Sequence, residues 1–129
     1  MMRDVVRQTE DWTIILKRVS DGPNYLAPMG FTAFRPPHGK RFLHIYLRIR
    51  NDAKVTRWFG YDSCVVDDGP SWVVPSLVTV AMGVQAVVHG DEEYSSQESS
   101  LRMLTFVYSV DSEPLRLRCG AAEFLLPAF

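Results

Sequence analysis

The chain of 129 residues contains no uninterrupted apolar run of the roughly 18 residues that a membrane-spanning helix requires. Its first residues, MMRDVVRQTEDW, carry charges at Arg3, Asp4 and Arg7 and lack the apolar centre of a signal peptide. We therefore expect no membrane span. We expect a cytoplasmic location for the chain as it stands, and an extracytoplasmic one if a signal segment has been removed.

Histidine and cysteine are scarce, and their spacing fits no metal site or catalytic motif. The three histidines, His38, His44 and His89, lie in separate segments, and no Gly-x-Ser-x-Gly turn is present. A structural zinc site needs four ligands, whereas Cys64 and Cys119 supply two that are far apart in the chain. The sequence therefore predicts a protein without a metal or other cofactor, and a protein that is not an enzyme.

The two cysteines leave a pair of alternatives open. A disulfide between Cys64 and Cys119 would form in an oxidising compartment and would tie together two distant segments. Two free thiols buried in the core are the other alternative, because unpaired cysteine is among the most buried residue types. We expect the free thiols and keep the disulfide as the alternative.

Neither sign of charge dominates the chain, whose formal net charge is −1. Basic side chains gather in the first half, where Arg48, Arg50 and Arg57 lie near aromatic residues in the sequence. Such interleaving resembles a platform for single-stranded nucleic acid. Because the second half is acidic, the chain as a whole lacks the basic excess of nucleic-acid-binding domains. We therefore expect no nucleic-acid partner.

Alternation of apolar and polar residues is the dominant pattern, and it predicts β-strands. Residues 20–40 are rich in proline and glycine, which predicts a long connection with one short edge strand near Phe31–Phe34. Residues 91–100 are polar and acidic, which predicts a loop. The remaining strands are expected within 12–20, 41–51, 54–60, 62–69, 71–74, 76–90, 101–110, 114–120 and 122–127.

About seven to nine short strands, without an amphipathic helix or an internal repeat, define an all-β protein. At this length a single immunoglobulin-like sandwich of two antiparallel sheets is favoured over a barrel. We place this domain at residues 12–129, after an N-terminal extension at residues 1–11.

The stretch RFLHIYLRIRN, residues 41–51, alternates without a break and is the clearest strand in the chain. One face is wholly aliphatic and is expected in the core: Leu43, Ile45, Leu47 and Ile49. The other face is expected on the outside of a sheet, where it could contact a partner: Phe42, His44, Tyr46, Arg48 and Arg50. Arg116 and Arg118 on a later strand would extend this outer face.

A second group of candidates is aromatic and comprises Trp58, Phe59, Tyr61 and Trp72. Exposed aromatic rings stack on sugars in carbohydrate-binding sandwiches, and tryptophan and tyrosine concentrate at protein interfaces. The same side chains also suit a core, where each tryptophan would stabilise the fold by about 3 kcal/mol. We expect at least partial burial of Trp58 and Trp72.

Three segments together resemble one known family: PPHGKRFLHIYLRIRN (36–51), YDSCVVDDGPSW (61–72) and RMLTFVYSVDSEPLRLRCGAAEFLLP (102–127). They are similar to the strands and Asp-Gly turn of the DUF4352 family. The resemblance implies an immunoglobulin-like sandwich, and it implies a bacterial domain that is usually extracytoplasmic or attached to a lipoprotein. It implies no catalytic residues.

We predict a non-enzymatic binding module that contacts a protein partner through a sheet face or through the aromatic loop with Tyr25, Phe31 and Phe34. A carbohydrate-binding module that uses Trp58, Tyr61 and Trp72 as a platform for sugar rings is the alternative, and a structural domain that self-associates through an edge strand is a further one. The residues predicted to bind a partner or ligand are Trp58, Tyr61, Trp72, His44, Tyr46, Arg48 and Arg50.

Overall fold

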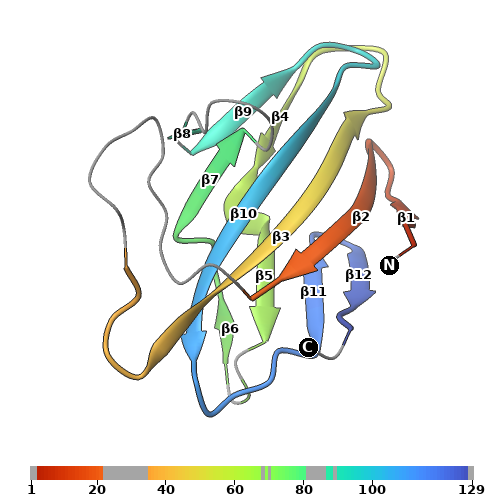
Figure 1. Cartoon of the computed structure of the whole chain (residues 1–129). Coiled ribbons are helices and arrows are strands. Elements are labelled where there is room, and N and C mark those ends of the chain that lie inside the picture. Colours follow the sequence, from red (N-terminus) through yellow and green to blue (C-terminus); the bar gives the residue numbers. More distant parts are fainter. Residues whose placement is uncertain are drawn as a thin grey trace.

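The computed structural model describes residues 3–21, 35–67, 69, 71–80, 87–88 and 90–127, which form twelve strands and one short 3-10 turn, η2 (Tyr61–Ser63) (Figure 1). The strands are β1 (Val5–Gln8), β2 (Trp12–Ser20), β3 (Lys40–Asn51), β4 (Arg57–Gly60), β5 (Cys64–Asp67), β6 (Trp72–Val73), β7 (Leu77–Val80), β8 (Val87–Val88), β9 (Asp91–Tyr94), β10 (Ser99–Ser109), β11 (Arg116–Cys119) and β12 (Ala122–Leu125). The described ranges contain no helix that is long and apolar enough to cross a membrane.

The strands build two layers. One sheet has the order β1-β2-β3-β10-β7-β8, the other has the order β12-β11-β5-β6, and β4 pairs with β9 in a separate two-stranded ladder. Every pairing is antiparallel. In Figure 1 the four-stranded sheet lies across the larger one, and the β4–β9 ladder lies at one end of the domain. The predicted two-sheet antiparallel β-sandwich is confirmed.

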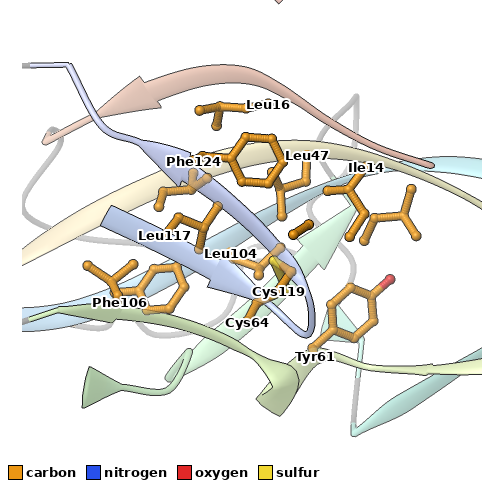
Figure 2. Close-up of a cluster of buried hydrophobic side chains, with 14 of the residues drawn as sticks. Ile14, Leu16, Leu47, Tyr61, Cys64, Leu104, Phe106, Leu117, Cys119 and Phe124 are labelled. Atoms are coloured by element: carbon orange, nitrogen blue, oxygen red, sulfur yellow. A yellow bond between two sulfur atoms is a disulfide. The ribbon is translucent and has the colours of Figure 1, made fainter. Parts of the chain in front are cut away.

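The core lies between the two layers. Leu43, Ile45, Leu47 and Ile49 on β3 are all fully buried, as the alternation of that strand predicts. β3 pairs along its length with β10, where Leu104, Phe106 and Tyr108 are buried as well. Figure 2 shows Leu47, Leu104 and Phe106 facing Leu117 and Phe124 of the opposite sheet. The central strands are therefore stabilised by burial of their inward-facing side chains.

Two segments differ from the prediction. Residues 1–11 were expected to form an extension, but Val5–Gln8 pairs with β2 as the edge strand of the large sheet. Residues 91–100 were expected to form a loop, but β9 occupies Asp91–Tyr94 and β10 begins at Ser99. The connection between them is a tight turn in which Gln97 has a φ of +66°. Its acidic composition concealed a strand in which Glu92 pairs with Arg102 of β10, while Asp91 and Glu93 are exposed.

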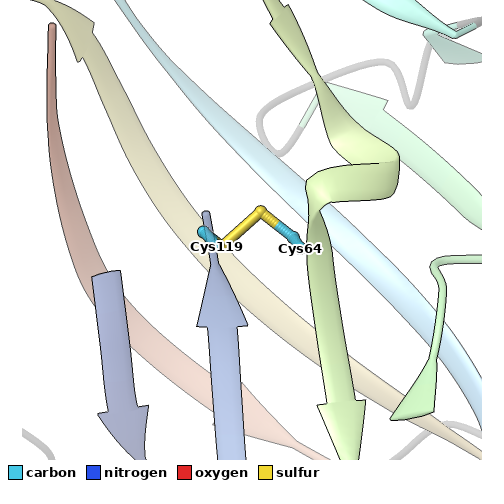
Figure 3. Close-up of a disulfide and its surroundings, with 2 residues drawn as sticks. All are labelled: Cys64 and Cys119. Atoms are coloured by element: carbon cyan, nitrogen blue, oxygen red, sulfur yellow. A yellow bond between two sulfur atoms is a disulfide. The ribbon is translucent and has the colours of Figure 1, made fainter. Parts of the chain in front are cut away.

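Cys64 and Cys119 form a disulfide, so the expectation of free thiols is wrong. The two residues lie on neighbouring strands of the four-stranded sheet and are directly opposite each other in the β5–β11 ladder (Figure 3). Both side chains point into the core and are buried. The pairing depends on which strands are neighbours, and the sequence does not contain that information locally.

Some predictions fall on residues outside those that the structure describes. These are the edge strand near Phe31–Phe34, the aromatic loop with Tyr25, and the histidine at position 89. The expectation that residues 76–90 form one or two strands is met in the part described, by β7 and β8.

Candidate functional site

The outer face of β3 is less open than we expected. Phe42 is buried beside Met103, and His44 is only 1% exposed, with its Nδ1 atom 2.9 Å from Oγ1 of Thr105. The expectation that Phe42 and His44 lie on an exposed surface is therefore wrong. His44 is not accessible to a partner, because neighbouring side chains cover this part of the sheet.

The remaining predicted residues on β3 interact with neighbouring strands. Tyr46 is half-buried, and the guanidinium of Arg18 lies 5.4 Å from the centre of its ring. Arg50 is exposed and pairs with Asp52, with Nε 2.7 Å from Oδ1. Arg48 is half-buried between these two residues along the strand. Arg116 and Arg118 do not extend this face, since β11 belongs to the other sheet.

The predicted aromatic group is divided among three environments. Tyr61 is buried and its hydroxyl lies 2.5 Å from the carboxylate of Glu92 and 2.8 Å from the hydroxyl of Tyr94. Burial, together with the neighbouring Tyr94 and Glu92, raises the pKa of the Tyr61 phenol above its ordinary value. Trp58 is 62% exposed, contrary to the expected burial, whereas Trp72 is 38% exposed. The three predicted platform residues therefore share no surface.

Trp58 lies beside an open pocket of about 170 Å³. The pocket is formed where the turn between β1 and β2, the segment from β4 to η2, and the turn between β11 and β12 meet. Its lining is mostly apolar and comprises Thr9, Trp12, Ile14, Trp58, Phe59, Gly60, Ser63, Cys119, Gly120 and Ala121. Sequence reasoning missed Thr9, Trp12 and Gly120, because nothing local indicates that these three turns converge.

A group of perpendicular aromatic contacts supports one wall of the pocket. The ring of Trp12 lies 4.9 Å from that of Phe59 and 5.5 Å from that of Tyr94, in both cases edge to face. Phe59 in turn meets Tyr61 at 5.2 Å. Edge-to-face pairs add to the stabilisation that burial provides, and they fix ring orientation. These contacts therefore set the orientation of the rings that form this wall.

The turn between β11 and β12 is held against the opposite side of the pocket. Gly120 has a φ of +57°, a left-handed conformation that glycine adopts without steric cost. Its backbone N–H donates to the carbonyl of Ser63 at 3.2 Å. The disulfide ties the preceding residue, Cys119, to β5. This side of the pocket is therefore fixed by one covalent bond and one hydrogen bond.

Asn51 positions the segment that leads into β4. Its buried side-chain amide donates to the carbonyls of Val55 at 2.9 Å and Tyr94 at 3.0 Å, while its Oδ1 accepts from the N–H of Ala53 at 2.9 Å. These bonds hold the chain that carries Trp58 against the turn after β9. The predicted turn after Asn51 is thus stabilised by hydrogen bonds of the Asn51 side chain, a role that asparagine commonly has in turns.

A second exposed aromatic group lies on the outer face of the four-stranded sheet. The guanidinium of Arg118 is 4.5 Å from the ring centre of Trp72, and that of Arg116 is 5.6 Å from it. Arg116 also pairs with Asp67 at 3.7 Å and with Glu123 at 3.3 Å. Figure 1 places β6 and β4 toward opposite ends of the domain, so this group is separate from the pocket.

The described residues that line the pocket beside Trp58 carry no formal charge. The pocket lining contains no histidine, carboxylate, lysine or arginine side chain. In the part of the chain that the structure describes, no group of three or more His, Cys, Asp or Glu side chains is placed to hold a metal ion.

Comparison with known proteins gives similarity of fold only. No family model and no curated protein matches the sequence. A solved structure of an uncharacterised β-sandwich protein from Clostridium difficile 630 matches with a TM-score of 0.59 and 9% identity, over 88% of this chain and 80% of that chain. A protein of unknown function from Listeria monocytogenes EGD-e matches with a TM-score of 0.53 and 11% identity, over 82% of this chain and 62% of that chain. The structural neighbours are therefore bacterial β-sandwich proteins.

Proposed function

We propose that the domain is a binding module that holds a protein partner at the pocket beside Trp58. The observation that carries the proposal is the exposure of the Trp58 indole, 62%, next to a preformed apolar pocket. Tryptophan is seldom left so exposed, and it is the side chain most enriched among the residues that dominate protein interfaces.

The size and chemistry of the pocket favour a single apolar side chain of the partner. At about 170 Å³ it is smaller than the roughly 300–1,000 Å³ of typical small-molecule sites. Hydroxyl groups come only from Thr9 and Ser63, and the rest of the lining is apolar or glycine. A leucine, methionine or aromatic side chain would fill it, while Trp58 would pack on the adjoining backbone of the partner.

A carbohydrate ligand is less well supported. Sugar recognition at such a site would need several coplanar exposed rings and polar side chains for the hydroxyl groups. Tyr61 is buried, and Trp72 lies on the four-stranded sheet, away from Trp58. The lining of the pocket contains no carboxylate or amide side chain. Trp58 would therefore stack alone.

We also propose that the chain is a DUF4352-like domain that works outside the cytoplasm. The sandwich fold and the bacterial structural neighbours support the resemblance drawn from the sequence. The Cys64–Cys119 disulfide supports an oxidising compartment, because cytosolic thiols are kept reduced. Mass spectrometry of the thiols in protein from the native cells tests this, and free thiols there would contradict it.

The binding proposal is tested with peptides. Random peptides displayed on phage are selected on the folded domain, and the enriched sequence is synthesised and titrated by calorimetry. We expect an apolar anchor residue, and we expect Trp58→Ala to weaken binding about tenfold or more, as truncation of a central tryptophan does. Val110→Ala is the control, since Val110 is 49% exposed and does not line the pocket.

Three results would contradict the proposal. Selected peptides could lack an apolar anchor, or they could bind Trp58→Ala as tightly as the unchanged domain. A glycan array could instead show binding that depends on Trp58, which would replace the protein partner by a carbohydrate.

A further inference from the structure

We propose that the stacked pair Trp72–Arg118 is a second binding site, which takes a carboxylate from an acidic segment of a protein partner. The site lies on the outer face of the four-stranded sheet and is independent of the pocket beside Trp58.

The register of the sheet brings the two side chains together. Trp72 on β6 pairs with Asp67 on β5, and Arg118 on β11 pairs with Val65 on the same strand. Side chains alternate between faces along each strand, so Trp72, Arg116 and Arg118 all point outward, away from the buried Val66 and Leu117. The indole therefore reaches across β5 to the arginines of β11.

The two arginines differ in their charge partners. Arg116 forms ion pairs with both Asp67 and Glu123, and Glu123 also lies directly opposite Arg118 in the β11–β12 register. Arg118 is exposed, and among the described residues no carboxylate oxygen lies within ion-pair distance of it. The guanidinium of Arg118 is thus held by its contact with the ring of Trp72, and it forms no ion pair with a described residue.

Stacking leaves the hydrogen-bonding edge of Arg118 free. A guanidinium that lies over an indole uses its π-face, while its N–H groups point outward in the plane of the group. The contact also restricts the side chain, so less conformational entropy is lost when the N–H groups bind an anion. A planar carboxylate matches two of these donors at once.

The charge of the surroundings selects a carboxylate over a polyanion. The four charged side chains of this group sum to zero, because Asp67 and Glu123 balance Arg116 and Arg118, and Arg118 is the arginine that forms no ion pair with a described residue. Nucleic acid and other polyanions need many cations in a row, whereas one carboxylate needs one. Exposed apolar side chains nearby in the sheet, Leu125 and Val74, would contact the rest of a protein segment.

A short peptide with alternating glutamate and leucine, blocked at both ends, is the probe. Its binding is followed by nuclear magnetic resonance at the indole N–H of Trp72 and the Nε–H of Arg118. We expect both signals to shift with the glutamate peptide and to remain unchanged with the glutamine version. Added salt should weaken the binding, since the contact is charged and exposed.

Three variants separate stacking from charge. Arg118→Gln should weaken peptide binding about tenfold, and Arg118→Lys should weaken it nearly as much, because lysine keeps the charge and loses the planar donor pair. Arg3→Gln, which removes the same charge from an exposed N-terminal position, should have no effect. The signals of Trp72 and Arg118 report this face and not the pocket beside Trp58, so this test fails or succeeds independently of the pocket.

The proposal is overturned if the glutamine peptide binds equally well or if Arg118→Gln binds like the unchanged domain. It is also overturned if inorganic phosphate or single-stranded DNA, and not the glutamate peptide, shifts the Trp72 and Arg118 signals.

Discussion

The guanidinium of Arg102 and the carboxylate of Glu92 form a two-bond pair at the end of the core, with Nε 3.0 Å from Oε1 and Nη2 2.6 Å from Oε2. Arg102 sits on β10 two residues before the buried Leu104, so it points toward the inside of the sandwich. The hydroxyls of Tyr61 and Tyr94 also donate to Glu92. One carboxylate thus joins β9, β10 and the η2 turn.

Removing the guanidinium should destabilise the fold strongly. Arg102→Met leaves the Glu92 carboxylate without its cation, and we expect a loss of about 2–3 kcal/mol in the free energy of unfolding. The loss is smaller than for a fully buried pair, because the Glu92 side chain is still 22% exposed. Urea unfolding measures it.

Arg50→Met is the matched control, because Arg50 pairs with Asp52 on the surface, where such a pair contributes less than about 1 kcal/mol. Equal losses in the two variants would show that burial does not strengthen the Glu92–Arg102 pair.

The same pair predicts loss of stability in acid. Burial alone would raise the pKa of Glu92, but hydrogen bonds from Arg102 and Tyr61 outweigh it and hold the pKa below its ordinary value of 4.5. A carboxyl with a lowered pKa in the folded state stabilises the fold above its unfolded pKa, and this contribution is lost as the pH falls through the folded value. Glu92→Gln should therefore flatten the decline in stability below about pH 4.5. A decline as steep as in the unchanged domain would contradict the assignment.

Two tyrosines should resist ionisation in alkali. Burial is the main cause that raises the pKa of Tyr94 to about 12, and it raises the pKa of Tyr61 as well. Because both pKa values exceed the ordinary value of 10.0, the associated stabilisation is complete below pH 10 and is lost as the pH rises through the folded values. Absorbance at alkaline pH should show both phenols still protonated at about pH 11, and urea should release them. Ionisation of all five tyrosines near pH 10 in the folded domain would refute this.

The core was predictable because its signal is local. Leu43, Ile45, Leu47 and Ile49 alternate within one strand, and a shift by one residue would expose them all. The opposite face of that strand was not predictable, since burial of His44 depends on Thr105 and on other neighbours far away in the chain.

The candidate sites were harder to predict than the core, because they depend on contacts between residues that are far apart in the chain. The acidic segment at 91–94 resembled a loop because an inward-pointing Glu92 is costly without a cation, and that cation is Arg102 on the next strand. Trp58 and Trp72 were recognised as candidates from residue type alone. Which of them lies beside a pocket and which stacks on arginine follows from the strand order.

Loss of the disulfide should lower stability by about 4 kcal/mol. The bond closes a loop with a sequence separation of 55, and a loop of that size restricts the unfolded chain by roughly this amount. The double variant Cys64→Ala with Cys119→Ala is compared with the unchanged domain by urea unfolding, with and without dithiothreitol. The reductant should destabilise only the unchanged domain. An effect of reductant on the double variant, or none on the unchanged one, would mean that the bond does not carry this stability.

Asn51 should control both stability and the segment that carries Trp58. Asn51→Ala removes a buried amide and leaves the carbonyls of Val55 and Tyr94 without their donor, so we expect a loss of about 2–3 kcal/mol. Because the lost bonds hold residues 53–55, hydrogen exchange should accelerate there more than in β3 and β10. Gln97→Ala is the control, since its exposed side chain makes one long bond, 3.3 Å, to Asp52 in the same region. If exchange at residues 53–58 rises no more in Asn51→Ala than in Gln97→Ala, this asparagine does not position Trp58.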